Sequence, residues 1–479
     1  MGIDSNSKFR VAELFAGVGG FRLGLEGEKF RFVFSNQWEP GETKQWASKI
    51  YEARFGSDGH VNEDIHKVTK LVPEHDLLVG GFPCQDYSVA RTISGEMGIE
   101  GEKGKLWTPI KHIIRDSKVR PKMIFLENVP RLLNSPSEHR GLNFGIILDD
   151  LLTMGYDVEW RIIQASDYGM PQKRSRIFIL AYRRPSKTNG KGTIGPKRRT
   201  RESMISWMTG SSNNGKKEPI GPFASSFPIS CTFPFDKKEV PSVSSFQWSS
   251  KSRPFGNAGY AWKDGGKSSK RWMWTFNCVP SYPGPFMTLG DIIMKNHEQE
   301  FEVTDSEKLR MYSYIKGEQK EWRIRKSDKK IAESIRTDSG NLWDLYQNCT
   351  KGYDSELWKQ SRADESYLEG VSRGIVYNYT AGSMSYPDPL DKPSRTVVTA
   401  EIGRSVSRMR HIIEYKKGKF RRLMPIELER LNMFPDDWTQ FQGISDSRRG
   451  FLMGNALVVG IVERLAEPLA DLLRNGGGN

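Results

Sequence analysis

The first 183 residues alternate short apolar runs with amphipathic stretches, and this alternation constrains the fold more than any other feature of the chain. Parallel strands separated by helices bury both faces of their sheet. We therefore predict an α/β fold with a mostly parallel sheet and helices on both faces. The predicted strands are Phe9–Phe15, Arg31–Asn36, Asp76–Gly80, Lys122–Glu127, Val158–Ile163 and Arg176–Tyr182, and the predicted helices include Thr43–Phe55, Leu106–Ile114 and Phe144–Met154.

The pattern changes after residue 184. Residues 184–290 are rich in Ser, Gly, Pro, Lys and Trp with little periodicity, and residues 291–400 are mixed and basic. Helical periodicity returns in Pro425–Met433 and Val458–Leu473. We predict a large domain over 1–185, a smaller loop-rich domain over 186–420, and a C-terminal segment over 421–479. The aromatic side chains of 246–276 are expected to form a small local core, with a base-stacking platform as the alternative.

A thiol and a carboxylate follow two of the predicted strands. Pro83-Cys84 comes just after Leu77–Gly81, and Glu127 ends the run that begins at Met123. Ligands gather at the carboxyl ends of parallel strands. A thiolate there can attack a pyrimidine ring while a protonated carboxyl supports the ring nitrogen, and burial of Glu127 would raise its pKa. The alternatives are a buried structural cysteine and a capping glutamate.

A glycine-rich turn, Phe15–Gly20, follows the first strand and predicts a nucleoside site. Its glycines allow a ligand to approach the backbone closely, although they do not form the G-x-G-x-x-G pattern. Trp38 and Asp64-Ile65 follow the next elements and could contact adenine or ribose. An ordinary tight turn, a core tryptophan and a helix-capping aspartate are the alternatives.

Arginines open the last predicted strand of this region. Arg174 and Arg176 are two residues apart, so on a strand they share one face and could bind a phosphate and a carbonyl oxygen. The alternative is a solvated edge. The basic segment Arg183–Arg201 is expected to contact a DNA backbone, with a solvated, mobile face as the alternative.

The charge of the chain favours a polyanionic partner. It has 72 Lys and Arg against 58 Asp and Glu, a formal net charge of +14, and nucleic acid is the commonest polyanion. The four cysteines form no C-x-x-C pair and the seven histidines show no ligand spacing, so we expect no metal. Without a long apolar run or a signal-peptide core, we expect a soluble, cytoplasmic monomer that binds no membrane.

The order of these motifs resembles that of the C5-cytosine DNA methyltransferase family, of the bacterial restriction–modification type. The resemblance covers about 1–183 and 385–470. One departure is Gln37, which stands where the family usually has an acidic residue before the aromatic. The matching segments are Phe15–Gly20, Trp38, Asp64-Ile65, Pro83-Cys84-Gln85 with Ser88, Gly104–Trp107, Glu127–Val129, Gln172–Arg176, Arg395–Glu401, Arg422–Pro425, Phe434–Trp438 and Gly454–Ala456.

The resemblance implies a Rossmann-like, S-adenosylmethionine-dependent methyltransferase domain over 1–185. It implies a target-recognition domain over 186–420, and a hinge and final helix over 421–479 that complete the large domain. Double-stranded DNA would lie between the domains. A methyl group would pass from S-adenosyl-L-methionine to C5 of a flipped-out cytosine, which leaves S-adenosyl-L-homocysteine. The enzyme would protect host DNA in a restriction–modification system, with no stable complex with a cognate endonuclease.

The resemblance also assigns roles to individual residues. Cys84 would attack C6 of the cytosine, and protonated Glu127 would hold N3 and the exocyclic amine. Arg176 would contact the cytosine O2 and fix Glu127, while Arg174 would pair with a phosphate. Among the DNA-facing residues, Gln85 and Ser88 would touch DNA and Asn128 would support the loop around Cys84. The cofactor residues would be Phe15, Gly17, Gly19, Gly20, Gln37, Trp38, Asp64, Ile65, Pro83, Leu106, Asn455 and Ala456.

Three other functions fit parts of this pattern. A tRNA-methylating relative would keep the fold, but its recognition part is typically shorter. A non-catalytic DNA-binding relative would be expected to lack Cys84, Glu127 or Arg176. A thiol enzyme unrelated to nucleic acid would need a histidine partner for Cys84, and the sequence offers no obvious one.

Overall fold

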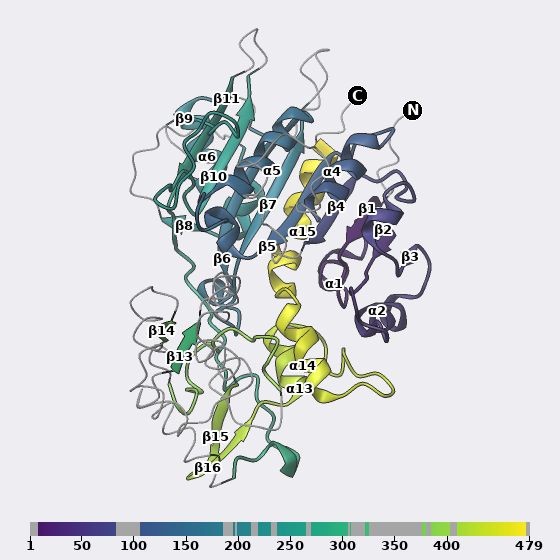
Figure 1. The fold of residues 1–479 in the computed structure, drawn as a ribbon, viewed down its shortest axis with the longest axis vertical. Helices are drawn as coiled ribbons and strands as arrows, with labels where there is room; N and C mark the ends of the chain where they lie inside the picture. The colour runs from purple at the N-terminus through teal and green to yellow at the C-terminus, as the bar shows by residue number, and fades with distance from the viewer. Residues whose placement is uncertain are drawn as a thin grey trace, which may run out of the picture. The chain divides into compact units, whose positions relative to one another are not determined.

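A ten-stranded sheet is the largest sheet among the described residues of the computed structural model (Figure 1). The structure describes residues 8–82, 106–184, 195–196, 199–211, 219–230, 237–264, 270–304, 307, 321–324, 376–379, 385–402 and 410–475. The strand order is β3-β2-β1-β4-β5-β7-β6-β10-β11-β9. These strands are β1 (Phe9–Leu14), β2 (Phe30–Asn36), β3 (His60–Val61), β4 (Leu77–Gly81), β5 (Met123–Asn128), β6 (Tyr156–Gln164), β7 (Ser175–Arg183), β9 (Lys237–Glu239), β10 (Ala258–Lys263) and β11 (Arg271–Phe276).

The half of the sheet from β3 to β5 is parallel, and every pairing beyond β5 is antiparallel. Residues of β4 and β5 such as Leu78 and Ile124 are fully buried, because helices cover both faces. The predicted α/β class, with a large sheet that has a parallel part and helices on both faces, is therefore confirmed. The sequence pattern did not indicate the antiparallel extension of the sheet.

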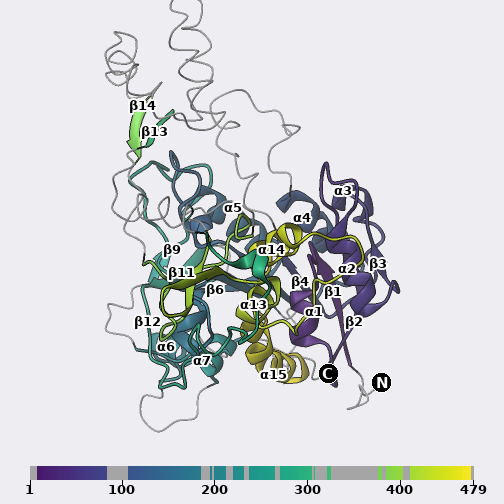
Figure 2. The ribbon, with the colours of Figure 1, turned by 90° about the horizontal axis from the view of Figure 1, so that it is seen from below.

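Helices α4 (Trp107–Asp116) and α5 (Leu142–Thr153) cover one face of the sheet, and α1 (Gly20–Leu25), α6 (Arg201–Thr209), α7 (Pro222–Ser226) and α15 (Val459–Asn475) cover the other (Figures 1 and 2). The first face packs a continuous apolar core. Alternate strand positions, such as Leu14, Leu78 and Leu126, meet side chains of α4 and α5 such as Ile110 and Leu148 there. The remaining described helices are α2 (Trp46–Phe55), α3 (Ile65–Val68), α13 (Pro425–Leu431) and α14 (Asp446–Asn455).

The structure divides the chain differently from the predicted boundary at residue 185. The large unit comprises 1–298, 389–403 and 423–479, and the small unit comprises 299–388 and 404–422. The large unit extends so far because β10 pairs with β6 and continues the sheet. Aromatic residues of this extension join the main core, where Phe255 packs edge-on against Phe144 and Trp160. The region from 246 to 276 is thus neither a separate local core nor, at these positions, an open stacking platform.

The C-terminal segment belongs to the large unit. Helix α15 packs on α1 so closely that a Cβ atom on Gly24 would come 2.8 Å from the Cβ atom of Val462. The small unit contains the hairpin of β15 (Ile412–Lys416) and β16 (Lys419–Arg422), in which the ring of Phe420 stacks on Tyr386 at 5.5 Å. It also contains the pair β13 (Glu321–Ile324) and β14 (Val376–Tyr379).

The part of the chain that the structure describes contains no helix long and apolar enough to cross a lipid bilayer. Nor do its His, Cys, Asp and Glu side chains include a group of three or more placed to hold a metal ion.

A carboxyl group is buried in β1, next to the glycine-rich turn. Glu13 accepts a hydrogen bond from the Tyr51 hydroxyl at 2.9 Å, and its other oxygen has no partner among the described residues. Burial raises the pKa of Glu13 from 4.5 to about 8, against the opposing effects of Tyr51 and Arg22. The carboxyl is therefore protonated at neutral pH in the folded protein and ionised in the unfolded chain.

This difference predicts that the fold loses stability as pH rises from about 4.5 to about 8, since the folded state binds one more proton in that window. The contribution of Glu13 approaches a loss of about 1.4 kcal/mol per pH unit. Glu13→Gln removes this part of the slope, which urea unfolding at a series of pH values measures. Exposed Glu52→Gln is the matched control, and an identical slope in wild type and Glu13→Gln would contradict the expectation.

Candidate active site

The candidate catalytic carboxyl lies where β4 and β5 end side by side. The two strands are parallel, and their register pairs Gly81 with Glu127. A Cβ atom on Gly81 would come 3.1 Å from Oε2 of Glu127, so the glycine leaves room for the carboxyl group. The predicted catalytic segment begins at Pro83, two residues after Gly81. It contains Cys84, Gln85 and Ser88 and lies outside the described residues.

Glu127 forms an ion pair with Arg176 at the start of β7. The Nε atom of Arg176 lies 2.8 Å from Oε1 of Glu127, and the two side chains are only 15% and 14% exposed. Burial raises the pKa of Glu127, although the neighbouring Arg176 and Arg174 oppose this effect. The predicted partnership of Glu127 and Arg176 is thus present in the geometry. It provides a largely buried carboxyl with a raised pKa, next to a guanidinium that the ion pair holds in place.

Asn128 supports the chain that leads to Cys84. Its Nδ2 atom donates to the carbonyl of Phe82 at 2.8 Å, and its Oδ1 atom accepts from the backbone N–H of Val129 at 2.8 Å. The side chain is buried, so it has no surface to offer DNA. Its side chain thereby fixes the residue just before Pro83.

Arg174 occupies a different place from the predicted phosphate contact. Its side chain is 1% exposed. Its Nη1 atom donates to the carbonyl of Val397 at 2.9 Å and its Nη2 atom donates to the carbonyl of Gly454 at 2.7 Å. A phosphate contact would need an open guanidinium, so the expectation for Arg174 is wrong for this structure. The residue joins the start of β7 to two distant parts of the chain.

Gln172 makes a similar connection, and the sequence reasoning gave it no role. It is fully buried, and its amide donates to the carbonyl of Leu431 at 3.2 Å and to Oδ1 of Asn432 at 3.0 Å. Its Oε1 atom accepts from the backbone N–H of Val397 at 2.8 Å. Only the resemblance of Gln172–Arg176 to a family motif pointed to this residue, since its partners are more than 200 positions away.

We expect Arg174→Met to lower the free energy of unfolding by about 2–4 kcal/mol, because two buried carbonyls lose their donors. Urea unfolding measures this change. Lys173→Met is the matched control, since Lys173 is exposed and a surface substitution changes stability by about 0.5 kcal/mol or less. Unchanged stability of Arg174→Met, together with a weaker dependence of DNA binding on salt, would restore the phosphate role.

The glycine-rich turn has the backbone that the nucleoside prediction requires. Phe15, Gly17 and Gly19 have φ angles of 55°, 58° and 88°. A Cβ atom on Gly17 would meet nothing within 4 Å, so the backbone there is open to a ligand. The N–H of Gly17 donates to Oε1 of Gln37 at 2.7 Å. The side-chain oxygen of Gln37 is therefore bonded to the turn, and the side-chain amide nitrogen is left to reach a ribose hydroxyl.

The other predicted cofactor residues lie beside or within the ends of described helices and strands. Trp38 is 36% exposed, which leaves part of its indole open to stacking. Asp64 caps α3 by accepting from the backbone N–H of His66 at 3.0 Å. Ile65 is buried in the core. Leu106, which precedes α4, is partly buried against the same core, Gly20 begins α1, and Asn455 and Ala456 lie at the exposed end of α14.

These observations fit a nucleoside cofactor. An open glycine backbone and a partly exposed indole from the next strand are the groups that receive a ribose and an adenine ring. The described residues thus include an open glycine backbone and a partly exposed indole after β1 and β2, and a carboxyl–guanidinium pair at the end of β5.

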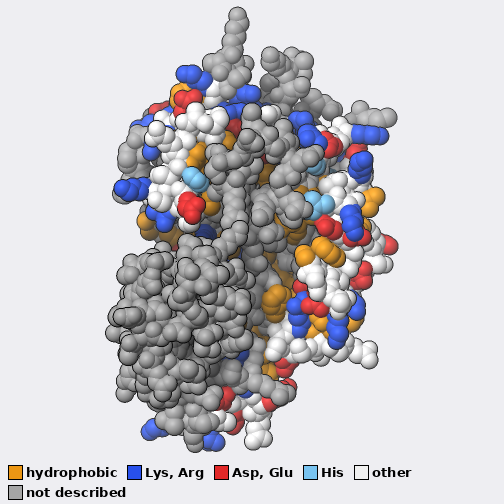
Figure 3. Space-filling view, viewed as in Figure 1, with side chains coloured by type: hydrophobic (Ala, Val, Ile, Leu, Met, Phe, Trp, Pro, Cys, Tyr) orange, Lys and Arg blue, Asp and Glu red, His pale blue; other side chains and the backbone are white. Residues whose placement is uncertain are grey.

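Three arginines of the basic segment Arg183–Arg201 are engaged inside the large unit. Arg183 donates to the carbonyl of Arg120, Arg184 to those of Lys263 and Leu152, and Arg199 to the carboxylate of Asp157. The guanidinium groups of these three arginines thus hold protein atoms, and the DNA contact of the segment stays a prediction. On the face shown in Figure 3, the described Lys and Arg side chains are interspersed with Asp and Glu.

Comparison with known proteins identifies the family of the chain. Residues 9–471 match the family model for C-5 cytosine-specific DNA methylase. The chain is 35% identical over 477 residues to Type II methyltransferase M.Sau3AI from Staphylococcus aureus, which covers 97% of this chain and 96% of that protein. It is 37% identical over 175 residues to Type II methyltransferase M.HhaI from Haemophilus parahaemolyticus, 36% of this chain and 49% of that protein.

Among solved structures, the S. pombe Dnmt2 methyltransferase aligns with a TM-score of 0.49 and 13% sequence identity, over 98% of this chain and 99% of that chain. The family match spans nearly the whole sequence, and the first relative is similar over almost its full length. The chain belongs to the C-5 cytosine-specific DNA methylase family and is a DNA (cytosine-5-)-methyltransferase.

Proposed function

We propose that this methyltransferase modifies a cytosine flipped out of duplex DNA through a transient bond between Sγ of Cys84 and C6 of the base. The observation that carries the proposal is the ion pair of Glu127 and Arg176 beside Gly81. In this pair, a carboxyl whose pKa burial raises and a cation lie beside the strand end that precedes Pro83-Cys84 in the sequence. Base flipping costs a few kcal/mol, which contacts in the protein pocket offset.

The thiolate of Cys84 attacks C6, and the C5–C6 electron pair becomes available at C5. Protonated Glu127 donates to N3 of the ring, so the charge that develops there is neutralised. Arg176 contacts the O2 atom and keeps Glu127 oriented. S-adenosyl-L-methionine supplies the methyl group that C5 takes up. S-adenosyl-L-homocysteine is left. A solvent base then removes the C5 proton, and the returning electrons expel the thiolate. The N3 proton goes back to the Glu127 carboxylate, which restores the ring and the enzyme.

The glycine-rich turn and Trp38 would hold the nucleoside part of the cofactor. The open backbone at Gly17 accepts the ribose side, and the partly exposed Trp38 indole stacks on adenine. Asp64 and the exposed Asn455 would contribute further polar contacts. The amide nitrogen of Gln37 is the group that could donate to a ribose hydroxyl, since its oxygen is engaged by Gly17.

We further propose that the modified cytosine lies in one recurring sequence and that methylation protects host DNA from a cognate endonuclease. The relatives that support this role are named Type II methyltransferases. The excess of Lys and Arg in the whole chain favours a DNA partner as well.

The test is methyl transfer from labelled S-adenosyl-L-methionine to duplex DNA, with the modified positions mapped at base resolution. The expected product is 5-methylcytosine at one recurring sequence. Duplex DNA and tRNA are offered in parallel reactions. Transfer to tRNA alone would replace the proposal with the tRNA-methylating alternative, and methylation scattered over all sequences would contradict the role in host protection.

A further inference from the structure

We infer that Trp438 is a positioning residue of the cofactor site, because its indole holds the glycine-rich turn in its ligand-ready shape. The Nε1 atom of Trp438 donates to the carbonyl of Val18 at 2.8 Å, across 420 positions of sequence. The inference rests on the proposed use of this turn for S-adenosyl-L-methionine. It gives the segment Phe434–Trp438 a function that its place in the motif order does not specify.

The turn needs support from outside because its conformation is unfavourable. Phe15 has a φ angle of 55°, a region that residues other than glycine rarely adopt, and Gly17 and Gly19 also have positive φ angles. From the sheet side, Ala16 donates to the carbonyl of Asn36 at 3.0 Å and Gly17 donates to Gln37. The bond from Trp438 to Val18 holds the other side of the same turn.

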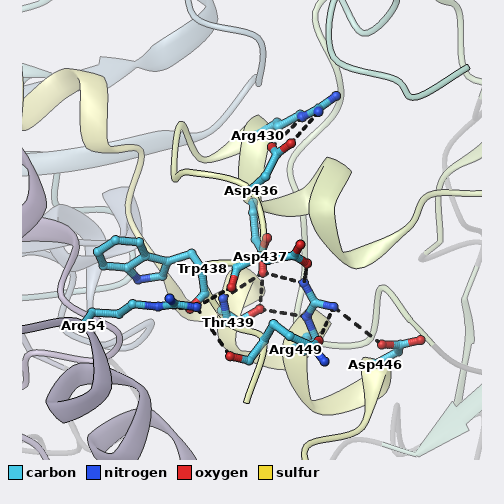
Figure 4. A network of polar contacts seen from close by, with 10 residues as sticks. Arg54, Arg430, Asp436, Asp437, Trp438, Thr439, Asp446 and Arg449 are labelled. Atoms are coloured by element: carbon cyan, nitrogen blue, oxygen red, sulfur yellow. Dashed lines mark hydrogen bonds and ion pairs between the residues drawn. The ribbon is translucent and has the colours of Figure 1, made fainter. Parts of the chain in front are cut away.

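The ring of Trp438 is itself fixed by packing. It lies edge-on to Phe55 with 5.5 Å between ring centroids, and it also contacts Phe434. The ring of Phe55 covers the turn directly, since a Cβ atom on Gly19 would come 2.2 Å from it. Arg54 lies over the indole at 5.4 Å and donates through Nε to the carbonyl of Trp438 at 2.9 Å (Figure 4). The glycine-rich turn, Phe55 and Trp438 therefore pack against one another.

A buried ion pair anchors the segment that carries Trp438. The carboxylate of Glu429 accepts from Nη2 of Arg449 at 3.0 Å and from the backbone N–H of Thr439 at 2.9 Å. The same Nη2 atom of Arg449 also contacts Oδ1 of Asp437 at 3.1 Å, and Arg449 Nη1 donates to Gln440 at 2.7 Å (Figure 4). Because Glu429 is fully buried and Arg449 nearly so, these contacts fix the residues on both sides of Trp438.

The helix that carries Arg449 reaches two other parts of the proposed cofactor site. Arg448, its neighbour on α14, pairs with Glu39 at 2.6 Å, directly after Trp38. Asn455 is the last residue of the same helix. The C-terminal segment therefore contacts the glycine-rich turn through Trp438 and the residue next to Trp38 through Arg448, and it also carries Asn455. This arrangement explains how residues far apart in sequence keep one nucleoside-binding shape.

The test compares Trp438→Phe with wild type for binding of S-adenosyl-L-homocysteine by calorimetry and for steady-state methyl transfer to DNA. Trp438→Phe keeps the aromatic packing and removes the donor to Val18. We expect the cofactor Kd and the KM for S-adenosyl-L-methionine to rise about tenfold, as befits one lost buried hydrogen bond. kcat and the KM for DNA should stay within about twofold of wild type, because the reacting groups are untouched.

Trp160→Phe is the matched control. Trp160 is also buried and donates through its indole to a backbone carbonyl, that of Gly256 at 3.2 Å, within the sheet extension. It should lose stability without losing cofactor affinity. Arg54 is exposed, and Arg54→Met removes its hydrogen bond to the carbonyl of Trp438 and its cation over the indole. This variant should raise the Kd for S-adenosyl-L-homocysteine by about threefold.

Equal cofactor affinities in Trp438→Phe, Trp160→Phe and wild type would overturn the positioning role of Trp438 alone. A fall in kcat without a rise in Kd would overturn it as well. A folded wild type that binds no S-adenosyl-L-homocysteine would instead overturn the proposed cofactor site, and the inference with it.

Discussion

Replacement of Cys84 by serine is expected to lower the rate of methyl transfer to DNA by at least about 10⁴-fold, since removal of a catalytic nucleophile costs this much in other enzymes. A thiol with an ordinary pKa of about 8.5 supplies some thiolate at neutral pH, whereas a serine hydroxyl stays protonated. Affinity for S-adenosyl-L-homocysteine should remain close to that of wild type. Single-turnover methyl transfer and calorimetry measure the two quantities.

The covalent step has its own readout. DNA that carries 5-fluorocytosine at the target should trap wild type, because the elimination that releases the thiolate needs a removable proton at C5. A band that survives denaturation and is absent with Cys84→Ser identifies the bond. Cys278→Ser is the control, since Cys278 is buried in the large unit and burial raises the pKa of its thiol. Trapping by Cys84→Ser, or none by wild type that methylates normal DNA, would contradict the proposed adduct.

Glu127→Gln is expected to lower kcat by about 10²–10⁴-fold, the usual contribution of a general acid. Glutamine can still donate a hydrogen bond to N3, but it cannot supply a proton. Burial raises the pKa of Glu127, so the active, protonated form persists to higher pH and is lost as pH rises through that raised pKa. The alkaline fall in the kcat of wild type that comes from Glu127 should therefore be missing in Glu127→Gln.

The control for this variant is Glu159→Gln. Glu159 is a fully buried carboxyl on β6 that accepts from Tyr182 at 2.8 Å and from Trp207 at 2.9 Å. Its replacement should lower stability and leave the pH profile of kcat unchanged. A Glu127→Gln enzyme with wild-type turnover would remove Glu127 from the chemistry and leave it as a partner that only orients Arg176.

Local sequence information predicted the elements that lie in one continuous stretch. The predicted strands Asp76–Gly80 and Lys122–Glu127 have apolar centres, and the structure has strands there, Leu77–Gly81 and Met123–Asn128. Helices α13 and α15 lie where helical periodicity returns. Periodicity within about ten residues suffices for such elements, because one face of each must be buried wherever the partner comes from.

Contacts between distant segments were beyond such reasoning. The first segment of the large unit ends at residue 298 and not at the predicted 185, because β10 pairs with β6 and continues the sheet. Local sequence does not indicate which strand will pair with an exposed strand edge. Arg174 and Arg176 are the same residue type and lie two positions apart. Arg174 is buried and donates to the carbonyls of Val397 and Gly454, whereas Arg176 pairs with Glu127. The local sequence pattern does not indicate which of the two arginines is buried in the framework and which one pairs with the carboxyl.

The sequence by itself determined the kind of chemistry: a thiol, a carboxyl and a glycine-rich turn at strand ends, in the order of one enzyme family. Strand ends converge in any parallel sheet, so the identity of these residues was sufficient. The tertiary structure alone decided which groups are engaged in the framework, such as Arg174, Gln172 and the oxygen of Gln37, and which partner holds the turn at Val18. Those outcomes depend on which buried polar group finds a partner, and each partner is supplied by a segment brought near only by folding.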